Sequence, residues 1–135
     1  MKLYIDENLP HALVAPLVKL FPKHNFRSFE QESLWGTEDI PLFRTLADRE
    51  FMAIITQDAR QLVNADERVA LKSAGLHWIG VPQLNEPGIH GIASTMSMII
   101  TGLPFVFQHD YEEPHEYQLK QIAAQRLRAP DVSPL

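Results

Sequence analysis

One short apolar run constrains this sequence more than any other feature. It reads Phe51-Met52-Ala53-Ile54-Ile55-Thr56-Gln57-Asp58, so it ends abruptly in a polar residue and a carboxylate. A run this short and β-branched, without a helical period, predicts a strand buried on both faces in the middle of a parallel sheet. Ligands of such sheets bind in the crevice at the carboxyl ends of the strands. Asp58 is therefore the first candidate for a site residue.

The N-terminus repeats this arrangement. Leu3-Tyr4-Ile5 is apolar and leads directly into Asp6, Glu7 and Asn8. Because both strands end at the same edge of the sheet, we expect Asp6 and Asp58 to approach each other at one pocket. Glu7 is expected to point elsewhere, since neighbouring side chains of an extended chain face opposite ways. Asn8 either orients Asp6 or caps the next helix, and capping is the favoured interpretation.

Apolar strand-like runs alternate with helical patterns along the chain. Strands are predicted near residues 3–5, 26–29, 51–58, 76–81 and 103–107, and helices near 8–21, 37–50, 64–74 and 89–101. Gln31 to Gly36 is predicted to be a loop, Thr37 and Asn64 to be helix caps, and Gly75 and Gly102 to end helices. The alternation predicts an α/β fold with a central parallel sheet of four or five strands and helices on both faces.

The chain is predicted to hold one α/β domain, residues 1–108, followed by a polar extension, residues 109–135. The extension carries one weak helical pattern, residues 116–127, with a thin apolar stripe. Such a helix hides its stripe on a neighbour or does not form. We therefore expect the extension to bind a partner or build a dimer, and to lie outside the catalytic core.

Composition limits the classes of function. The 135 residues carry a formal net charge of -5 and include no cysteine, which excludes disulfides and thiolate metal sites and argues against a broad phosphate-binding surface. No apolar run approaches the roughly 18 residues that span a bilayer, and the first residues do not resemble a signal peptide. We expect a cytoplasmic protein without membrane contact.

Three acidic groups are expected to meet at the carboxyl edge of the sheet. They are Asp6, Asp58, and either Glu38 or Asp39 in the first turn of the helix that follows Thr37. Carboxylate oxygens suit hard divalent cations, and Mg²⁺ is commonly bound by one or two carboxylates together with a substrate phosphate. The pattern favours metal-assisted hydrolysis of a phosphodiester. The plainer alternatives are loop residues at strand ends and acids favoured by the helix dipole.

Other candidate residues have weaker support. His109 and His115 lie in an acidic segment and lack the spacing of a zinc site. The chain has no glycine-rich phosphate loop and no serine in an elbow motif. Arg44 and Arg60 are placed where either could hold a phosphate, although a surface ion pair is the ordinary interpretation.

Three motifs in the first 82 residues carry a family resemblance. They are the start Met1-Lys2-Leu3-Tyr4-Ile5-Asp6-Glu7-Asn8-Leu9-Pro10, the helix opening Glu38-Asp39-Ile40, and the strand end Ile54-Ile55-Thr56-Gln57-Asp58. Together they resemble the PIN-like domains of the small DENLP-type group related to VapC toxins. The resemblance implies a PIN-like fold with a Mg²⁺ or Mn²⁺ site for RNA cleavage. It places metal-binding and catalytic roles on Asp6, Asp39 or Glu38, and Asp58.

Thr56 closes the apolar run, so we expect it beside the same pocket, with Asn8 and Glu7 in supporting positions. The sequence departs from the family pattern after Asp58, because Gln61 stands about three positions on, where such domains often carry a further acid. Asp66 is farther away.

Three hypotheses follow. The first is a metal-dependent ribonuclease, the toxin of a toxin–antitoxin pair, with an RNA substrate, an antitoxin protein as partner and a homodimeric assembly. The alternative is a non-catalytic PIN-like module that binds RNA or a protein partner. A phospho-accepting receiver domain also places acids after its first and third strands. It normally needs a lysine at the end of its fifth strand, and Phe107-Gln108-His109 offers none.

Overall fold

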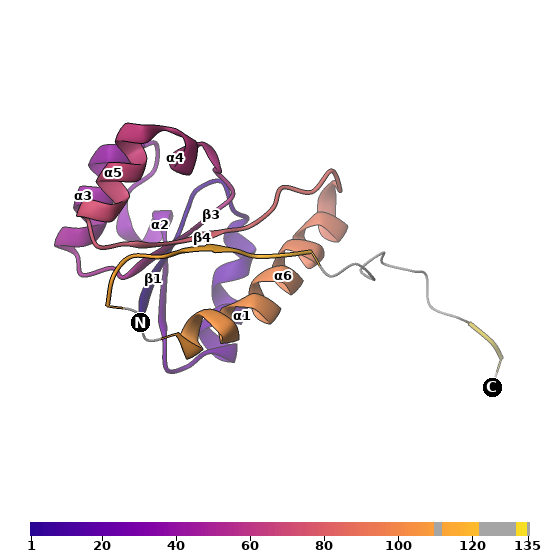
Figure 1. Ribbon diagram of the computed structural model, residues 1–135. Coiled ribbons are helices and arrows are strands. Elements are labelled where there is room, and N and C mark those ends of the chain that lie inside the picture. The colour runs from indigo at the N-terminus through magenta and orange to yellow at the C-terminus, as the bar shows by residue number, and fades with distance from the viewer. Residues whose placement is uncertain (110–111, 122–131, 135) are drawn as a thin grey trace.

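The protein is described here by a computed structural model that covers residues 1–109, 112–121 and 132–134. Its strands are β1 (Lys2–Ile5), β2 (Asn25–Ser28), β3 (Ala53–Thr56), β4 (His77–Gly80) and β5 (Glu116–Gln118). Its helices are the 3₁₀ helix η1 (His11–Leu13), α1 (Val14–Leu20), α2 (Phe29–Glu32), α3 (Asp39–Asp48), α4 (Arg60–Val63), α5 (Ala65–Ser73) and α6 (Gly88–Gln108). The strands form one parallel sheet in the order β2-β1-β3-β4-β5 (Figure 1). The predicted α/β fold is confirmed.

The two faces of the sheet bury two separate hydrophobic clusters. Successive side chains of a strand point to opposite faces. Accordingly, Ile55 of β3 packs with α1 and α6, whereas the adjacent Ile54 packs with α3 and α5. Figure 1 shows these pairs of helices on opposite sides of the sheet. Both isoleucines are 0% exposed, so truncation of either to alanine should cost about 2–5 kcal/mol of stability.

Of the two predicted helix caps, Asn64 is confirmed and Thr37 is wrong. The Asn64 side chain caps α5 as predicted, accepting hydrogen bonds from the backbone N–H groups of Asp66 and Glu67 at 3.0 and 3.2 Å. Gly75, with φ +70°, follows this helix. Thr37 does not cap α3, because that helix starts at Asp39 and Glu38 occupies the cap position.

Two short helices, α2 and α4, occupy segments where the sequence predicted no helix. α2 begins within the predicted strand 26–29 and forms because Ser28 and Gln31 exchange side-chain and backbone hydrogen bonds in a capping box. α4 forms the first turn after Asp58. Neither has a long apolar period, so hydrophobic patterning gave no sign of them.

The predicted helix at residues 89–101 continues to Gln108, so the strand predicted at 103–107 is wrong. Gly102 does not end the helix, and it lies where α6 packs closely against another segment. A Cβ at this position would lie 2.5 Å from Cδ2 of Leu119, the residue that follows β5. Glycine therefore lets the end of β5 approach α6, and β5 supplies the fifth strand.

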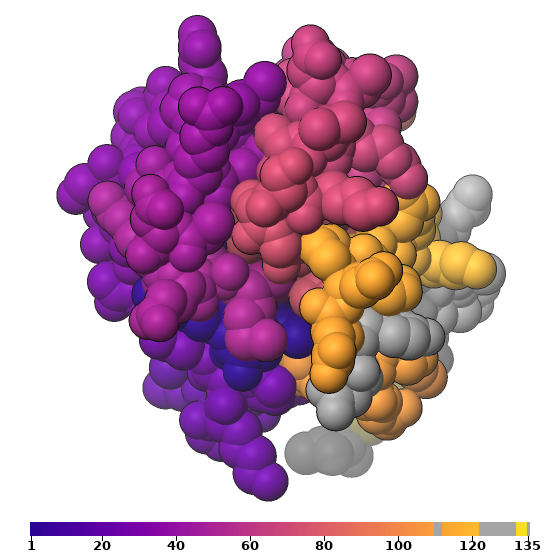
Figure 2. All heavy atoms as spheres, turned by 60° about the vertical axis from the view of Figure 1, so that its left-hand side comes forward, coloured from indigo at the N-terminus to yellow at the C-terminus, as the bar shows by residue number. Residues whose placement is uncertain are grey.

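The extension after residue 108 contributes to the core. Residues 116–118 pair with β4, and Leu119 is 7% exposed in the cluster that contains α1 and α6. The segment also packs beside α5, where Nη2 of Arg68 lies 2.9 Å from Oε2 of Glu116 (Figure 2). The helix predicted at residue 116 is therefore wrong over residues 116–118, and residues 122–127 lie outside the described residues. The division between residues 108 and 109 stays a prediction about domain organisation.

α6 is 21 residues long and, by length and composition alone, could cross a membrane. Sequence analysis anticipated no such segment. Its inner face, which includes Met98, Ile99, Leu103 and Val106, is buried in the core. Core helices of α/β domains pass the same test, so the helix is weak evidence for a membrane span, and the cytoplasmic location stays a prediction.

Candidate functional site

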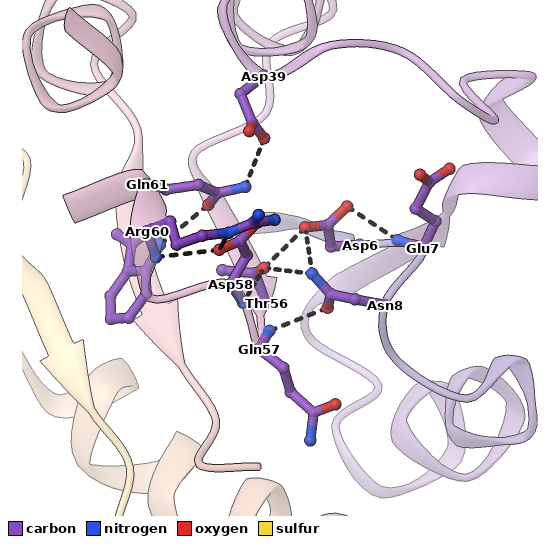
Figure 3. A network of polar contacts seen from close by, with 10 residues as sticks. Asp6, Glu7, Asn8, Asp39, Thr56, Gln57, Asp58, Arg60 and Gln61 are labelled. Atoms are coloured by element: carbon purple, nitrogen blue, oxygen red, sulfur yellow. Dashed lines mark hydrogen bonds and ion pairs between the residues drawn. The ribbon is translucent and has the colours of Figure 1, made fainter. Parts of the chain in front are cut away.

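The candidate site lies where β1 and β3 end side by side. Ile5 is paired with Ile55, and the backbone N–H of Asp6 donates to the carbonyl of Ile55 at 3.0 Å. Asp6 and Asp58 therefore leave neighbouring strands at the same edge, as predicted. Figure 3 shows them on either side of Thr56.

The Thr56 hydroxyl connects the two strand ends. It donates to Oδ2 of Asp6 at 2.7 Å and accepts hydrogen bonds from Nδ2 of Asn8 at 2.9 Å and from the backbone N–H of Asp58 at 3.0 Å. One donation and two acceptances use the full capacity of a hydroxyl. Thr56 is 0% exposed. It thus lies beside the acids, as expected, but its hydroxyl positions them and has no capacity left for a phosphate.

Asp6 is a buried carboxylate in a surrounding of neutral donors. Besides Thr56, the backbone N–H of Glu7 and the side chain of Asn8 donate to it at 2.8 and 3.0 Å. It is 5% exposed, and this burial raises its pKa, while the hydrogen bond from Thr56 partly offsets the rise. No cationic side chain is paired with it in the described part of the chain. A proton or a metal ion at Asp6 would relieve the cost of the buried charge.

Asn8 orients the site and caps no helix. Its Nδ2 donates to Asp6 and Thr56, and its Oδ1 accepts the backbone N–H of Gln57 at 2.9 Å. The 3₁₀ helix η1 begins after Pro10 without a side-chain cap. The capping interpretation is therefore wrong, and the orienting alternative describes the contacts.

Asp58 has a different environment. Its carboxylate accepts hydrogen bonds from Nε and Nη2 of Arg60 at 2.9 and 2.7 Å, and the backbone N–H of Arg60 adds a third at 3.0 Å. These contacts lower the pKa of Asp58. The Arg60 side chain is 88% exposed. Arg60 is thus engaged in an ion pair, as its ordinary interpretation predicts, and it occupies both oxygens of the predicted metal ligand.

Asp39, the first residue of α3, joins the site through Gln61. Nε2 of Gln61 donates to Oδ1 of Asp39 at 2.6 Å, and Oε1 of Gln61 accepts from the Trp78 indole at 3.1 Å. Gln61 is 1% exposed. Burial raises the pKa of Asp39, and the negative charge of Asp58 raises it further. The family resemblance leads us to expect a further acid at position 61. Gln61 instead donates a hydrogen bond to the acid Asp39.

The side chains of the other two predicted acids make no hydrogen bond to Asp6, Asp39 or Asp58, although the charge of Glu7 acts on Asp6 and Asp39. Glu38 is exposed before α3. Oε2 of Glu7 accepts the backbone N–H of Gly36 at 2.7 Å, so Glu7 points away from Asp6, as predicted. Of the two alternatives for the third acid, Asp39 is the one whose charge acts on Asp6.

Sequence analysis missed Glu67. Its Oε2 is buried without a hydrogen-bond partner among the described residues. Its pKa is raised by burial and by the charges of Asp39 and Asp58. Glu67 is the third residue of a helix capped by Asn64, a position where an acid is common. An acid at this position is explained by helix capping alone, so nothing in the sequence pattern placed Glu67 near Asp39 and Asp58.

The donor set of this edge fits a hard divalent cation in its chemistry. As placed, no three acidic or histidine side chains of the described residues are arranged to hold one ion. Both carboxylate oxygens of Asp58 are hydrogen-bonded to Arg60. Asp6, Asp39 and Glu67 nevertheless supply carboxylate oxygens whose charge is disfavoured, and Mg²⁺ or Mn²⁺ prefers such ligands. Rotation of the exposed Arg60 side chain would free Asp58 to join them.

Comparison with known proteins identifies the family. The model of a family described as "PIN like domain" matches residues 1–82, which run from β1 through β4 and include Asp6, Asp39 and Asp58. Searches among curated proteins and among solved structures gave no significant match. The matched segment covers more than half of the chain and ends before α6, so the chain belongs to the PIN-like domain family.

Proposed function

We propose that this protein is a metal-dependent ribonuclease that hydrolyses RNA phosphodiester bonds. Asp6, Asp39 and Asp58 would hold Mg²⁺ or Mn²⁺, with Glu67 as a further ligand. The observation that carries the proposal is the gathering of these acids at the carboxyl edge of a nuclease-type fold, three of them with raised pKa values. Acids with perturbed pKa values that are gathered in this way are more common at functional sites than elsewhere.

A bound divalent cation would neutralise charge on the scissile phosphate and lower the pKa of a bound water, which makes a nucleophile at neutral pH. The chain's own residues would fix the ligand oxygens. Thr56 and Asn8 set the orientation of Asp6, and Gln61 sets that of Asp39. Partners of this kind commonly change metal affinity or activity by 10- to 100-fold when removed. Arg60, once released from Asp58, carries a guanidinium suited to a phosphate.

An exposed tryptophan supports single-stranded RNA as the substrate. Trp35 is 71% exposed in the loop before α3, and the next residue, Gly36, hydrogen-bonds to Glu7 beside Asp6. The ring is supported by Phe29, with 4.8 Å between ring centroids. Stacking of one base on such a ring contributes about 1–3 kcal/mol. Base stacking suits a protein whose net charge of -5 disfavours broad phosphate contacts.

A second function, a non-catalytic module that binds RNA or a protein, is favoured by a specific observation. Arg60 donates hydrogen bonds to both oxygens of Asp58, and Gln61 donates to one oxygen of Asp39, so the protein's own side chains engage these acids. The toxin role and an antitoxin partner rest on the family resemblance, and a homodimer rests on the apolar stripe of the C-terminal extension; all three stay predictions.

Cleavage of an end-labelled, single-stranded RNA with and without millimolar Mg²⁺ or Mn²⁺ tests the proposal. Asp58→Asn should lower metal-dependent cleavage by at least about 100-fold, comparable to the loss of a preorganised group at a reacting phosphate. The matched control is Asp66→Asn, because Asp66 is an exposed acid on nearby α5 and has no charged partner among the described residues. If wild type cleaves no more than Asp58→Asn in either metal, the non-catalytic module replaces the nuclease.

A further inference from the structure

We propose that the cleft beside the acidic edge binds one nucleobase of the substrate strand; this inference rests on the proposed function and specifies its substrate contacts. The cleft has a volume of about 510 Å³. Its walls come from the segment after β1, the end of β3, the loop before α6 and the first turns of α6. A volume of this size is typical of small-ligand sites.

The cleft shares a wall with the acid network. Asn8 and Gln57 both line it, and the same two residues hold Asp6 in place through the hydrogen bonds from Asn8 to Asp6 and from the Gln57 backbone to Asn8. A strand whose phosphate lies at the acids would therefore place a neighbouring base in the cleft.

A threonine hydroxyl in this cleft has no hydrogen-bond partner among the described residues. Thr95 is 5% exposed, lies on α6 and lines the cleft. The adjacent Ser94, 4% exposed, donates to Oε2 of Glu86 at 3.1 Å, and Thr101 on the same helix donates to the carbonyl of Ser97 at 2.8 Å. Thr95 makes neither kind of contact, so its hydroxyl can donate to and accept from a ligand in the cleft. A ligand with a polar edge would supply the missing partner.

Gly91 allows this cleft to form. A Cβ at position 91 would lie 2.0 Å from the backbone oxygen of Glu86, so only glycine lets the loop before α6 fold this closely onto the helix. The same turn of α6 starts without a side-chain cap, since Pro87 occupies the cap position. The first turn of the helix therefore lines the cleft with backbone as well as side chains.

The lining favours a base over a phosphate. The side-chain amides of Gln57, Gln83 and Asn85 offer both donors and acceptors, as the edge of a base requires. The lining contains no lysine or arginine, while Glu7 and Glu86 add negative charge that repels phosphate. Apolar contacts for the faces of a ring come from Leu9, Leu84 and Ile92.

The test is binding of the four uncharged ribonucleosides to the metal-free protein, followed by NMR. At least one nucleoside should bind and shift the amide signals of Gln83, Asn85 and Thr95. Thr95→Val, which removes the hydroxyl at nearly constant shape, should weaken this binding about 3- to 10-fold, the equivalent of one hydrogen bond. Thr95→Ser should bind as wild type does. Asn85→Ala, at an exposed loop position, should also weaken binding and does not depend on repacking of the core.

Two results would overturn the inference: no nucleoside shifts these signals, or Thr95→Val and Asn85→Ala both bind as wild type does. Inorganic phosphate is the control ligand, and if it alone shifts these signals, the proposed ligand class is wrong. Because nucleosides carry no scissile phosphate and no metal is added, the outcome is independent of cleavage. RNA cleavage without nucleoside binding would support the nuclease and contradict the base site. Nucleoside binding without RNA cleavage would support the base site and contradict the nuclease.

Discussion

The ends of β1 and β3 lie side by side in the sheet, yet they hold their carboxylates in opposite ways. Asp6 is buried, receives hydrogen bonds from neutral groups and has a raised pKa. Asp58 is partly exposed, is neutralised by the guanidinium of Arg60 and has a lowered pKa. The difference shows that two acids at neighbouring strand ends have different environments. Asp6 has a fixed orientation and a disfavoured charge, while Asp58 is paired with the exposed side chain of Arg60, which can rotate away.

This difference changes an expectation that sequence alone supports. Mutual repulsion of the acids predicts that Asp58→Asn leaves the metal-free protein as stable as before or more stable. In the structure, burial is the largest cause of the raised pKa values of Asp6 and Asp39, whereas Asp58 is stabilised by Arg60. Asp58→Asn would relieve the repulsion that Asp58 exerts on Asp39, but it would also remove the ion pair with Arg60, so a net gain in stability is expected from changes at Asp6 or Asp39.

The largest expected effect on stability is at Thr56, whose hydroxyl is hydrogen-bonded to groups that follow both β1 and β3. Thr56→Val removes the donor to buried Asp6 and the acceptor for the Asp58 backbone N–H and the Asn8 side chain. Each buried group left unpaired costs about 1–3 kcal/mol, so we expect a loss of about 3 kcal/mol or more in urea unfolding. Thr56→Ser is the control and should lose much less, because it keeps the hydroxyl.

Sequence alone predicts that Thr56→Val affects activity more than stability. A Thr56→Val protein as stable as Thr56→Ser would contradict the linking role of the hydroxyl.

The two carboxylates should differ in the pH dependence of stability, an effect of intermediate size. The raised pKa of Asp6 means that the folded state binds its proton more readily than the unfolded state, so its charge costs stability as pH rises above the ordinary value of about 3.9. The free energy of unfolding of Asp6→Asn minus that of wild type should therefore increase with pH. For Asp58→Asn the difference should become more negative with rising pH, because the lowered pKa stabilises the wild type once the acid is ionised.

Urea unfolding of the three metal-free proteins across the acid range, at steps of pH from 3 to 7, measures both differences. The absolute offset of Asp6→Asn depends on how the amide replaces the carboxylate, but the sign of the slope does not. If the two differences in the free energy of unfolding changed with pH in the same direction, the predicted contrast between Asp6 and Asp58 would be contradicted.

The smallest expected effect is at Arg60. Arg60→Ala removes the cation that occupies Asp58 and should strengthen Mn²⁺ binding a few-fold, because the ion no longer competes with a guanidinium. Arg44→Ala is the matched control, since Arg44 is exposed on α3 and its loss changes net charge equally. Calorimetric titration with Mn²⁺ compares the two. Equal affinities would mean that the Arg60–Asp58 pair does not oppose the metal.

The sequence predicted the β1 and β3 ends well because both signals are local. Ile54 and Ile55 sit in an apolar run with no helical alternative, and the first acids after each run had to emerge at one edge of a parallel sheet. The same local reasoning failed at Gly102, whose role depends on Leu119, seventeen positions further along the chain. A glycine used for close packing carries the same local signal as a glycine that ends a helix.

The partners of the acids could not be predicted, for a related reason. The contact of Gln61 with Asp39 joins residues far apart in sequence, and that of Gln61 with Trp78 depends on how α4 packs against β4. Asn8 had two plausible roles, and only the proximity of Thr56 decides between them. Single-sequence patterns therefore located the acids, while tertiary packing determined which groups hold them.

The most direct test of the central claim is anomalous diffraction from crystals of the protein grown with Mn²⁺. We expect one strong Mn²⁺ peak at the carboxyl edge, bound by Asp6, Asp39 and Asp58, with Arg60 turned away from Asp58 into solvent. No peak at this edge at saturating Mn²⁺, with Arg60 still hydrogen-bonded to Asp58, would contradict the claim that these strand ends form a metal site.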